Sequence, residues 1–314
     1  MLNARPILTA IALGLAATPA FAWDDFGHMV VAAIAYERLK GSPQVRAKVD
    51  ALIKLNPDYK TWIVNVAAVQ RGEVAFLMAA RWPDAIKRES AYTNDGADNG
   101  ETPTEPVASL NIGYRDKARH KYWHYEDVGF STDGTAVEPA KVPNAETQIV
   151  RFRATLASPK AGAGLKSYDL SWLIHLVGDV HQPLHATSRF TADLPHGDVG
   201  GNKVALCAAP CRDELHAFWD DALGRDAGTA PAIARAKTIP AAPVALVRVT
   251  KVPTWIQESV AAAKADVYTP PIGAAGQGPY TLDDAYRARA KDVATERVAL
   301  AGARLARLVG DALK

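Results

Sequence analysis

Two histidine–aspartate pairs, each with three residues between its members, constrain this sequence more than any other feature. His175 precedes Asp179 in the first pair, and His216 precedes Asp220 in the second. Residues four apart on a helix lie on one face, so the two side chains of a pair can reach the same cation. One pair alone would be weak evidence for a metal site, because a lone histidine on an apolar helix is usually a hydrogen-bonded core residue. Two pairs with His185 between them predict two metal positions carried on helices.

The residue types in these pairs indicate which metal they bind. Imidazole together with carboxylate favours zinc over calcium, which prefers oxygen ligands. Neither pair contains a cysteine, which argues against a purely structural site made of four thiolates. The sequence therefore predicts zinc.

The chain has only two cysteines, Cys207 and Cys211. They are close enough to close a small disulfide loop in an oxidising compartment. So short a ring constrains the unfolded chain little, and the bond would stiffen one loop rather than hold the fold together. Two reduced thiols and half of a zinc site are the alternatives, and both rank lower because better ligands are plentiful nearby.

Residues 1–22 have the three regions of a secretory signal peptide. Arg5 supplies the positive charge, Ile7–Ala17 is an apolar stretch too short to span a bilayer, and Ala20-Phe21-Ala22 has the A-x-A form of a cleavage site. An uncleaved anchor is the alternative. Cleavage would release a free amine on Trp23 and place the protein in a periplasm or outside the cell.

The composition is that of an ordinary globular protein, with 48% hydrophobic and 22% charged residues. Residues 23–314 contain no obvious linker, so we expect one domain. Loss of the signal peptide removes Arg5 and no acid, which lowers the formal net charge from +2 to +1. Such a chain lacks the basic surplus of DNA-binding proteins, and any attraction for a polyanion must be local, with bound metal as its obvious source.

Most of the sequence has helical periodicity, which predicts a mainly helical single domain with ligand-bearing loops. We expect helices over Gly27–Leu39, from a cap at Ser167 to near Pro183, and over Leu282–Leu313. Strand signals are modest and occur at Val204–Leu206 and Val244–Val252. Long loops are expected at Ser90–Ser109 and Phe130–Asn144.

Further motifs occur along the chain: Trp23–His28, Arg81-Trp82-Pro83-Asp84, Tyr122-Trp123-His124-Tyr125, His175–His185, Gly200-Gly201-Asn202, the His216/Asp220 pair and a final helix over Ala301–Ala306. They occur in the order found in the type I nucleases, and the whole of residues 23–314 resembles that family. These are secreted, trinuclear-zinc, single-strand-preferring nucleases and 3'-nucleotidases that share a helical fold with the zinc-dependent phospholipases C.

The resemblance implies three zinc ions and nine ligand residues. Asp84, His124, His175 and Asp179 would hold the first zinc. The Trp23 amine and carbonyl, His28 and the bridging Asp179 would hold the second, and His185, His216 and Asp220 the third. In this family Asp84 and Asp179 therefore belong to the catalytic centre. Zinc ions that share a carboxylate lie close enough to lower the pKa of one water between them.

Four more residues match positions near the family's substrate. Lys87 falls where the family has a basic residue facing the phosphoryl oxygens, with a solvated helix lysine as the alternative. Tyr125 could stack on a base or pack in the core. Asp127 is expected to hydrogen-bond that base or orient water. Asn202 could touch the substrate or shape its loop.

Several histidines and tryptophans have no place in this ligand set. His181 is off the His175/Asp179 face and is predicted to pack or to support a ligand. His120 and His196 are predicted at the surface. The remaining candidates for base platforms are expected in the core instead: Trp62, Trp123, Trp172 and Trp219.

The resemblance implies a secreted or periplasmic zinc endonuclease. Its substrates would be single-stranded DNA, RNA and 3'-mononucleotides, cut to leave 5'-phosphates, and no obligate protein partner is inferred. A zinc-dependent phospholipase C, or both activities together, is the alternative, with phospholipid as a substrate. Against it, the second pair closes with Asp220, where the phospholipases tend to have glutamate. A non-catalytic zinc-binding protein is a third possibility, and the Trp23 start argues against it.

Overall fold

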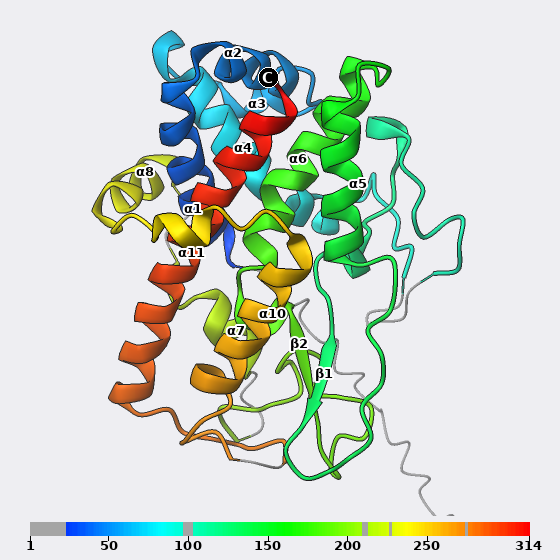
Figure 1. Cartoon of the computed structure of the whole chain (residues 1–314), viewed down its shortest axis with the longest axis vertical. Helices are drawn as coiled ribbons and strands as arrows, with labels where there is room; N and C mark the ends of the chain where they lie inside the picture. Colours follow the sequence, from blue (N-terminus) through cyan, green and yellow to red (C-terminus); the bar gives the residue numbers. More distant parts are fainter. Residues whose placement is uncertain (1–22, 97–102, 209–212, 226–227, 274–275) are drawn as a thin grey trace, which may run out of the picture.

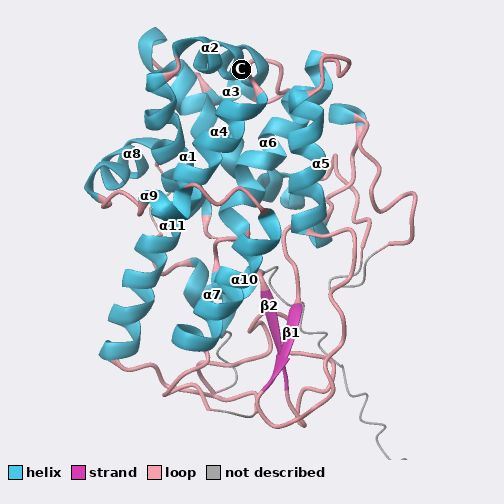
Figure 2. Cartoon of the chain, in the orientation of Figure 1, coloured by secondary structure: helices cyan, strands magenta, loops and turns pink. Residues whose placement is uncertain are grey.

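The computed structural model describes residues 23–96, 103–208, 213–225, 228–273 and 276–314. Within these ranges the chain is mainly helical, which confirms the predicted fold class (Figure 1 and Figure 2). None of the helices in these ranges is long and apolar enough to cross a membrane. The signal peptide and Cys211 lie outside the described residues, so the cleavage and the Cys207–Cys211 disulfide stay predictions.

A bundle of long helices forms most of the molecule. It consists of α1 (Asp25–Arg38), α4 (Arg71–Ala85), α5 (Ala145–Ala157), α6 (Ala163–Asp179) and α11 (Asp284–Ala312). Helix α1 packs against α4 and α11, and α6 packs against α4 and α5. Every residue of α6 from Ser167 to Asp179 is buried. The C-terminal end of α6 therefore places polar side chains inside the protein.

Shorter elements cover the bundle and lead into its loops. The α-helices are α2 (Pro43–Ile53), α3 (Tyr59–Trp62), α7 (Leu215–Asp220), α8 (Thr229–Thr238), α9 (Val244–Val247) and α10 (Val252–Ala262). Single 3₁₀ turns are η1 (Leu39–Gly41), η2 (Ala68–Gln70), η3 (Ile86–Arg88), η4 (Gly113–Arg115), η5 (Lys121–Trp123) and η6 (Pro183–His185), and η7 (Ala263–Val267) is π-helical.

The first and last predicted helices are confirmed as α1 and α11. Each begins at an aspartate whose carboxylate accepts a hydrogen bond from the first turn, Asp24 from the Gly27 amide and Asp283 from the Tyr286 amide. The two helices approach closely at Gly302, where a Cβ atom would lie 2.6 Å from the Cβ of Ile34. A glycine is required at this crossing because any larger residue would push the helices apart.

The predicted boundaries of α6 are wrong at both ends. The helix begins at Ala163 after Gly162, not at Ser167. Ser167 does not cap it, because this side chain is buried inside the helix and its hydroxyl pairs with the Tyr114 hydroxyl at 2.9 Å. The helix ends at Asp179, four residues before Pro183, and tight turns connect it to η6.

The strand predictions are also wrong. Val244–Val252 forms no strand: Val244–Val247 is the short helix α9 after Pro243, and Val252 begins α10, where a proline in the first turn favours a helix start. Val204–Leu206 contributes only an isolated bridge between Ala205 and Glu214. The expected loop at Ser90–Ser109 contains no helix in its described residues, whereas the loop at Phe130–Asn144 loses its first two residues to a strand.

A small parallel sheet joins two segments of the chain that carry histidines. Strand β1 (Val128–Ser131) pairs with β2 (Thr187–Phe190), with Val128 opposite Thr187. Just before it, the amide of Glu126 donates to the carbonyl of His185 at 2.8 Å. The sheet therefore keeps the segment after His124 beside the segment after His185.

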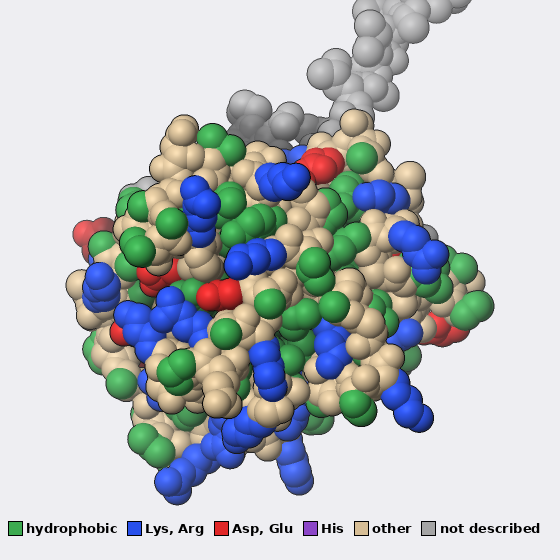
Figure 3. All heavy atoms as spheres, turned by 90° about the horizontal axis from the view of Figure 1, so that it is seen from above, with side chains coloured by type: hydrophobic (Ala, Val, Ile, Leu, Met, Phe, Trp, Pro, Cys, Tyr) green, Lys and Arg blue, Asp and Glu red, His purple; other side chains and the backbone are tan. Residues whose placement is uncertain are grey.

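Basic side chains gather at one end of the bundle, although the whole chain carries a net charge of only +2. Figure 3 looks onto this end, which holds α2, α3 and the C-terminus, and shows many Lys and Arg side chains. Lys48, Lys54 and Lys60 are exposed there, and the Lys48 ammonium donates to the carbonyl of Leu313. The C-terminal end of α6 lies away from this basic end (Figure 1).

Candidate metal centre

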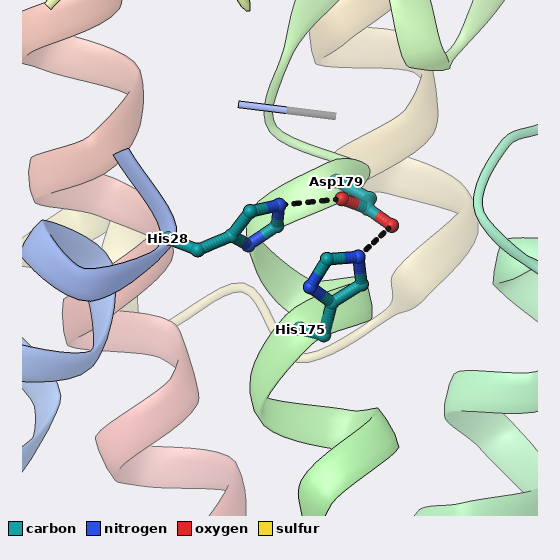
Figure 4. A group of neighbouring side chains, drawn as sticks. All are labelled: His28, His175 and Asp179. Carbon is teal, nitrogen blue, oxygen red and sulfur yellow. Dashed lines mark ion pairs between the residues drawn. The ribbon is translucent and has the colours of Figure 1, made fainter. Parts of the chain in front are cut away.

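The first ligand group lies at the end of α6 and combines His28 with His175 and Asp179 (Figure 4). His28 Nε2 is 3.2 Å from Asp179 Oδ1, and His175 Nε2 is 3.3 Å from Asp179 Oδ2. The two imidazoles stack with their centroids 3.8 Å apart. Each oxygen of Asp179 thus faces a different histidine, as a carboxylate that bridges two cations requires.

The start of α1 packs tightly over this end of α6. Gly178 allows the approach, because a Cβ atom there would lie 2.9 Å from His28 Nδ1. The Trp23 indole is buried and donates to the carbonyl of Gly178 at 3.1 Å. The amide of Asp24 donates to the main-chain carbonyl of Asp220 at 3.1 Å. These contacts fix the chain at Trp23 between the two histidine–aspartate pairs.

The second ligand group shares His175 with the first and adds Asp84 and His124. Asp84 comes from the last turn of α4, just after Pro83, and His124 follows η5. Asp84 Oδ1 is 3.6 Å from His175 Nε2 and 3.7 Å from His124 Nδ1. His124 Nδ1 is also 3.1 Å from Asp179 Oδ2. Both groups therefore meet at Asp179.

The third ligand group consists of His185 from η6 and the His216/Asp220 pair from α7. The Nε2 atoms of His185 and His216 are 3.0 Å apart. Asp220 Oδ2 is 3.5 Å from His216 Nε2, and Oδ1 is 3.8 Å from His185 Nε2. Gln182 holds this carboxylate by donating to Oδ1 at 2.7 Å.

Main-chain carbonyls orient three of these imidazoles. The Nδ1 atom of His175 donates to the carbonyl of Ala80 at 2.6 Å, that of His185 to His124 at 2.8 Å, and that of His216 to Gly200 at 2.6 Å. Each bond fixes the tautomer with a proton on Nδ1 and leaves the lone pair of Nε2 directed into its ligand group.

The donor atoms fit divalent cations. His185 Nε2 lies 3.0 Å from His216 Nε2, and both rings donate from Nδ1 to main-chain carbonyls, so in their neutral forms two Nε2 lone pairs face each other. A cation between the two nitrogens removes this repulsion. Protonation does not do so near neutrality, because burial lowers the pKa of His216 to about 4 and that of His185 well below the usual range. His175 Nε2 lies 2.9 Å from His124 Nδ1 in the neighbouring group.

The buried carboxylates support the same conclusion. Burial raises the pKa of Asp179 and of Asp220 well above the usual range, which makes their ionised forms costly without a nearby cation. Asp84 Oδ2 and Asp220 Oδ2 have no hydrogen-bond partner in the described part of the chain. Nitrogen and carboxylate donors in sets of three fit zinc sites with an open position.

A comparison of the sequence with known protein families shows which family the chain belongs to. The model of the S1/P1 nuclease family, described as "S1/P1 Nuclease", matches residues 23–314. The chain belongs to the S1/P1 nuclease family. The resemblance drawn from the motifs is thereby confirmed.

Two plant relatives agree with this assignment. Endonuclease 3 of Arabidopsis thaliana is 27% identical over 216 residues, which cover 68% of this chain and 59% of the relative. Endonuclease 5 of the same plant is 28% identical over 144 residues, which cover 45% of this chain and 40% of the relative. The matched part thus spans less than two thirds of either relative's length.

All eight side chains that the S1/P1 resemblance assigns as ligands lie in the three groups. They are His28, Asp84, His124, His175, Asp179, His185, His216 and Asp220. Trp23, the ninth residue, contributes its main chain rather than its side chain in this assignment, and its indole anchors it beside Gly178.

Lys87 lies beside the second ligand group. It is 8% exposed, and its ammonium group donates to Asp84 Oδ1 at 2.6 Å. The alternative of a solvated helix lysine is therefore wrong. This ion pair holds a positive charge next to the predicted zinc ligands, where a phosphoryl oxygen of a substrate could accept from it.

Tyr125 and Asp127 line a cavity of about 80 Å³, whose described lining includes none of the predicted ligand side chains. Tyr125 is partly buried and packs against the main core on one side, so both of its expected roles remain compatible with its position. Burial raises the pKa of Asp127 to about 7, and the charge of Asp198 adds to the effect. Asn202 shapes its loop by donating to the carbonyl of Val199 at 2.6 Å.

The remaining histidines differ in their surroundings. His196 is exposed and pairs with Glu138, as predicted for a surface residue. His181 is buried outside the three groups, where Nδ1 donates to the carbonyl of Val177 and Nε2 accepts from Arg304. The prediction for His120 is wrong, because this residue is only 1% exposed and pairs with two carboxylates.

The four tryptophans considered as base platforms pack in hydrophobic clusters and do not line the cavity beside Tyr125. Trp123 and Trp172 are buried in the main core, Trp62 packs partly buried against it, and Trp219 is buried in a second hydrophobic cluster. Gln182 was missed as the residue that positions Asp220, although it stands within the His175–His185 motif. An amide three residues after the ligand Asp179 was the available signal.

Proposed function

We propose that the protein is a zinc-dependent endonuclease that hydrolyses single-stranded DNA and RNA and leaves 5'-phosphates, with 3'-nucleotidase activity. The observation that supports this most is the position of Asp179, whose two oxygens face His28 and His175 while His124 approaches from a third element. Two cations that share one carboxylate, with a third close by, suit phosphoester hydrolysis.

Bound zinc would activate water as the nucleophile and neutralise the charge that develops on the phosphate and on the departing 3' oxygen. The chain's own groups bind and orient the substrate. The Lys87 ammonium, held by Asp84, offers a donor to a phosphoryl oxygen. The Tyr125 ring offers a face to a base, and the Asp127 carboxyl offers an edge contact in the same cavity.

This arrangement favours an unpaired strand. A base that enters the cavity beside Tyr125 must first leave the stack of its neighbours. In a duplex this also breaks a base pair, which costs roughly a few kcal/mol for each base. Single strands do not incur this cost. Stacking on an aromatic ring contributes roughly 1 to 3 kcal/mol per base, which supports binding without requiring a specific sequence.

We also propose that the enzyme acts after export, in a periplasm or outside the cell. The signal-peptide pattern of residues 1–22 and the two closely spaced cysteines support this location. The histidine and aspartate donors of all three groups are compatible with zinc. Asp220 stands where the zinc-dependent phospholipases tend to have glutamate, which favours nuclease activity over phospholipase activity.

The proposal is tested by comparing hydrolysis rates on single-stranded DNA, duplex DNA, a 3'-mononucleotide and phosphatidylcholine. We expect single-stranded DNA to be cut at least about tenfold faster than duplex, because even about 1.4 kcal/mol of opening cost corresponds to that factor. The products should carry 5'-phosphates. Products with 3'-phosphates, or hydrolysis of phosphatidylcholine alone, would contradict the proposal.

A further inference from the structure

His120 is a buried histidine that the metal groups do not use. Its Nδ1 atom lies 2.8 Å from Asp95 Oδ2, and its Nε2 atom lies 2.9 Å from Asp116 Oδ2. Carboxylates only accept hydrogen bonds, so both contacts are satisfied when both ring nitrogens carry protons. The geometry therefore corresponds to a positively charged imidazolium between two negative groups.

The rest of the residue is fixed as well. The imidazole stacks on the Trp123 ring with a centroid distance of 3.5 Å and an angle of 4°. The His120 amide donates to Asp95 Oδ1 at 2.8 Å. Its φ angle of 47° is in the left-handed region, which a residue other than glycine adopts at a cost. The contacts of His120 maintain that conformation.

These contacts connect three separate segments. Asp95 belongs to the loop after α4, Asp116 follows η4, and His120 directly precedes η5. The Tyr122 hydroxyl also donates to Asp95 Oδ2, at 2.7 Å. The indole of Trp123 donates to the carbonyl of Ala108 at 3.0 Å. The turn that ends at His124 is thus held by side chains rather than by a long helix.

The charged and titratable groups around His120 are Asp95, Asp116 and the Tyr122 hydroxyl, and the Trp172 ring lies beyond at 6.0 Å. Burial acts to lower the pKa of His120, but its bonds to Asp116 and Asp95 outweigh burial and raise it. The pKa of Asp95 is lowered, because the hydrogen bond and charge of His120 outweigh its own burial. The two shifts agree with an ion pair.

We propose that His120 is a positioning residue, whose imidazolium, clamped between Asp95 and Asp116 and stacked on Trp123, directs His124 toward Asp84 and His175. This inference rests on the proposed function only in requiring that His124 binds zinc. His120 is not proposed to contact the substrate. The clamp would stiffen the turn that carries His124, which no long helix supports.

The variant His120→Asn tests the proposal, because asparagine tolerates the left-handed backbone but cannot hold both carboxylates. We expect the affinity of the zinc that His124 would hold to fall roughly 10- to 100-fold, the usual loss when a group that supports a ligand is removed. The other two zinc ions should remain. His196→Asn is the matched control, since His196 also pairs with a carboxylate but is exposed, and it should bind zinc like the parent.

A pH series separates an ionic clamp from simple packing. The raised pKa of His120 means that its contribution to stability is complete below the ordinary value of 6.5 and declines as pH rises through the raised value. The lowered pKa of Asp95 means that its contribution is present above 3.8 and is lost as pH falls through the lowered value. The difference in melting temperature between parent and His120→Asn should therefore be largest between these limits.

Asp116→Asn supplies a second variant, which keeps the shape and one acceptor but removes a charge. It should weaken the same zinc, and its stability deficit should also shrink at high pH. Unchanged zinc affinity in both variants would overturn the proposal, as would a stability deficit that does not vary with pH. Equal loss of all three zinc ions would assign His120 to general folding instead. A parent protein that binds no zinc would refute the proposed function and with it the positioning of a zinc ligand, whereas the pH series would still test the ionic clamp itself.

Discussion

Replacing Asp179 with alanine is expected to remove more zinc than any other single ligand substitution and to lower single-strand cleavage by more than about 10²-fold, the loss typical of one oriented group that stabilises a transition state. The reason is its position between two ligand groups. Its two oxygens face His28 and His175, and His124 lies 3.1 Å from one of them. Zinc per chain, measured by elemental analysis after gel filtration, checks the first part.

Asp220→Ala is the matched control for this experiment. Asp220 is an equally buried carboxylate, also four residues after a histidine, but it belongs to one ligand group only. It should therefore lose about one zinc where Asp179→Ala loses about two. Equal zinc contents in the two variants would refute the bridging role of Asp179, whatever their activities.

An extension of the chain before Trp23 should have the second large effect. If the amine of Trp23 ligates zinc, any preceding residue turns it into an amide, which is a poor ligand. The Trp23 indole and the Asp24 amide fix this part of the chain between Gly178 and Asp220, so it has little freedom to avoid the added residue. Protein with one additional alanine before Trp23 should bind less zinc and lose most nuclease activity.

The comparison needs protein that begins at Trp23 and a control extended after Lys314, which is exposed at the other end of the chain. The control should keep full zinc and full activity. Protein that retains residues 1–22 should behave like the alanine extension, so the enzyme would be nearly silent until export. Full activity of the extended protein would refute amine ligation and leave His28 and Asp179 to hold that zinc.

Sequence reasoning succeeded where the relevant geometry is local. His175 and Asp179 are four residues apart on one helix, and so are His216 and Asp220, so spacing alone predicts that each pair converges. The helical spacing of apolar residues along α1 and α11 is equally local, which is why both helices were predicted near their true bounds.

Contacts between elements that are far apart in the sequence could not be predicted from local spacing. His28, Asp84 and His124 come from three separate elements, and only the resemblance to a family placed them in one centre. Strands β1 and β2 are four residues each and pair across more than fifty residues, so no local periodicity reveals them. Ser167 has the residue type of a cap, but its hydroxyl is used inside the fold.

His120 is the clearest example of a residue whose environment depends on contacts that are distant in the sequence. Its loop-like surroundings predicted a surface residue, whereas the fold buries it against Trp123 and supplies Asp95 from a distant loop. Asp116 stands four residues before it, but no helix spans the two, so this spacing carried no meaning in the sequence. A buried ion pair is visible only once the segments are placed together.

The central claim is that three buried ligand groups bind zinc and that hydrolysis depends on it. The most direct measurement is zinc content and single-strand cleavage of the same preparation of protein beginning at Trp23, before and after removal of metal and during its return. We predict three zinc ions per chain, no cleavage without them, and recovery of 5'-phosphate products as zinc is restored. Full cleavage by metal-free protein, or a content of one zinc with full activity, would contradict the account.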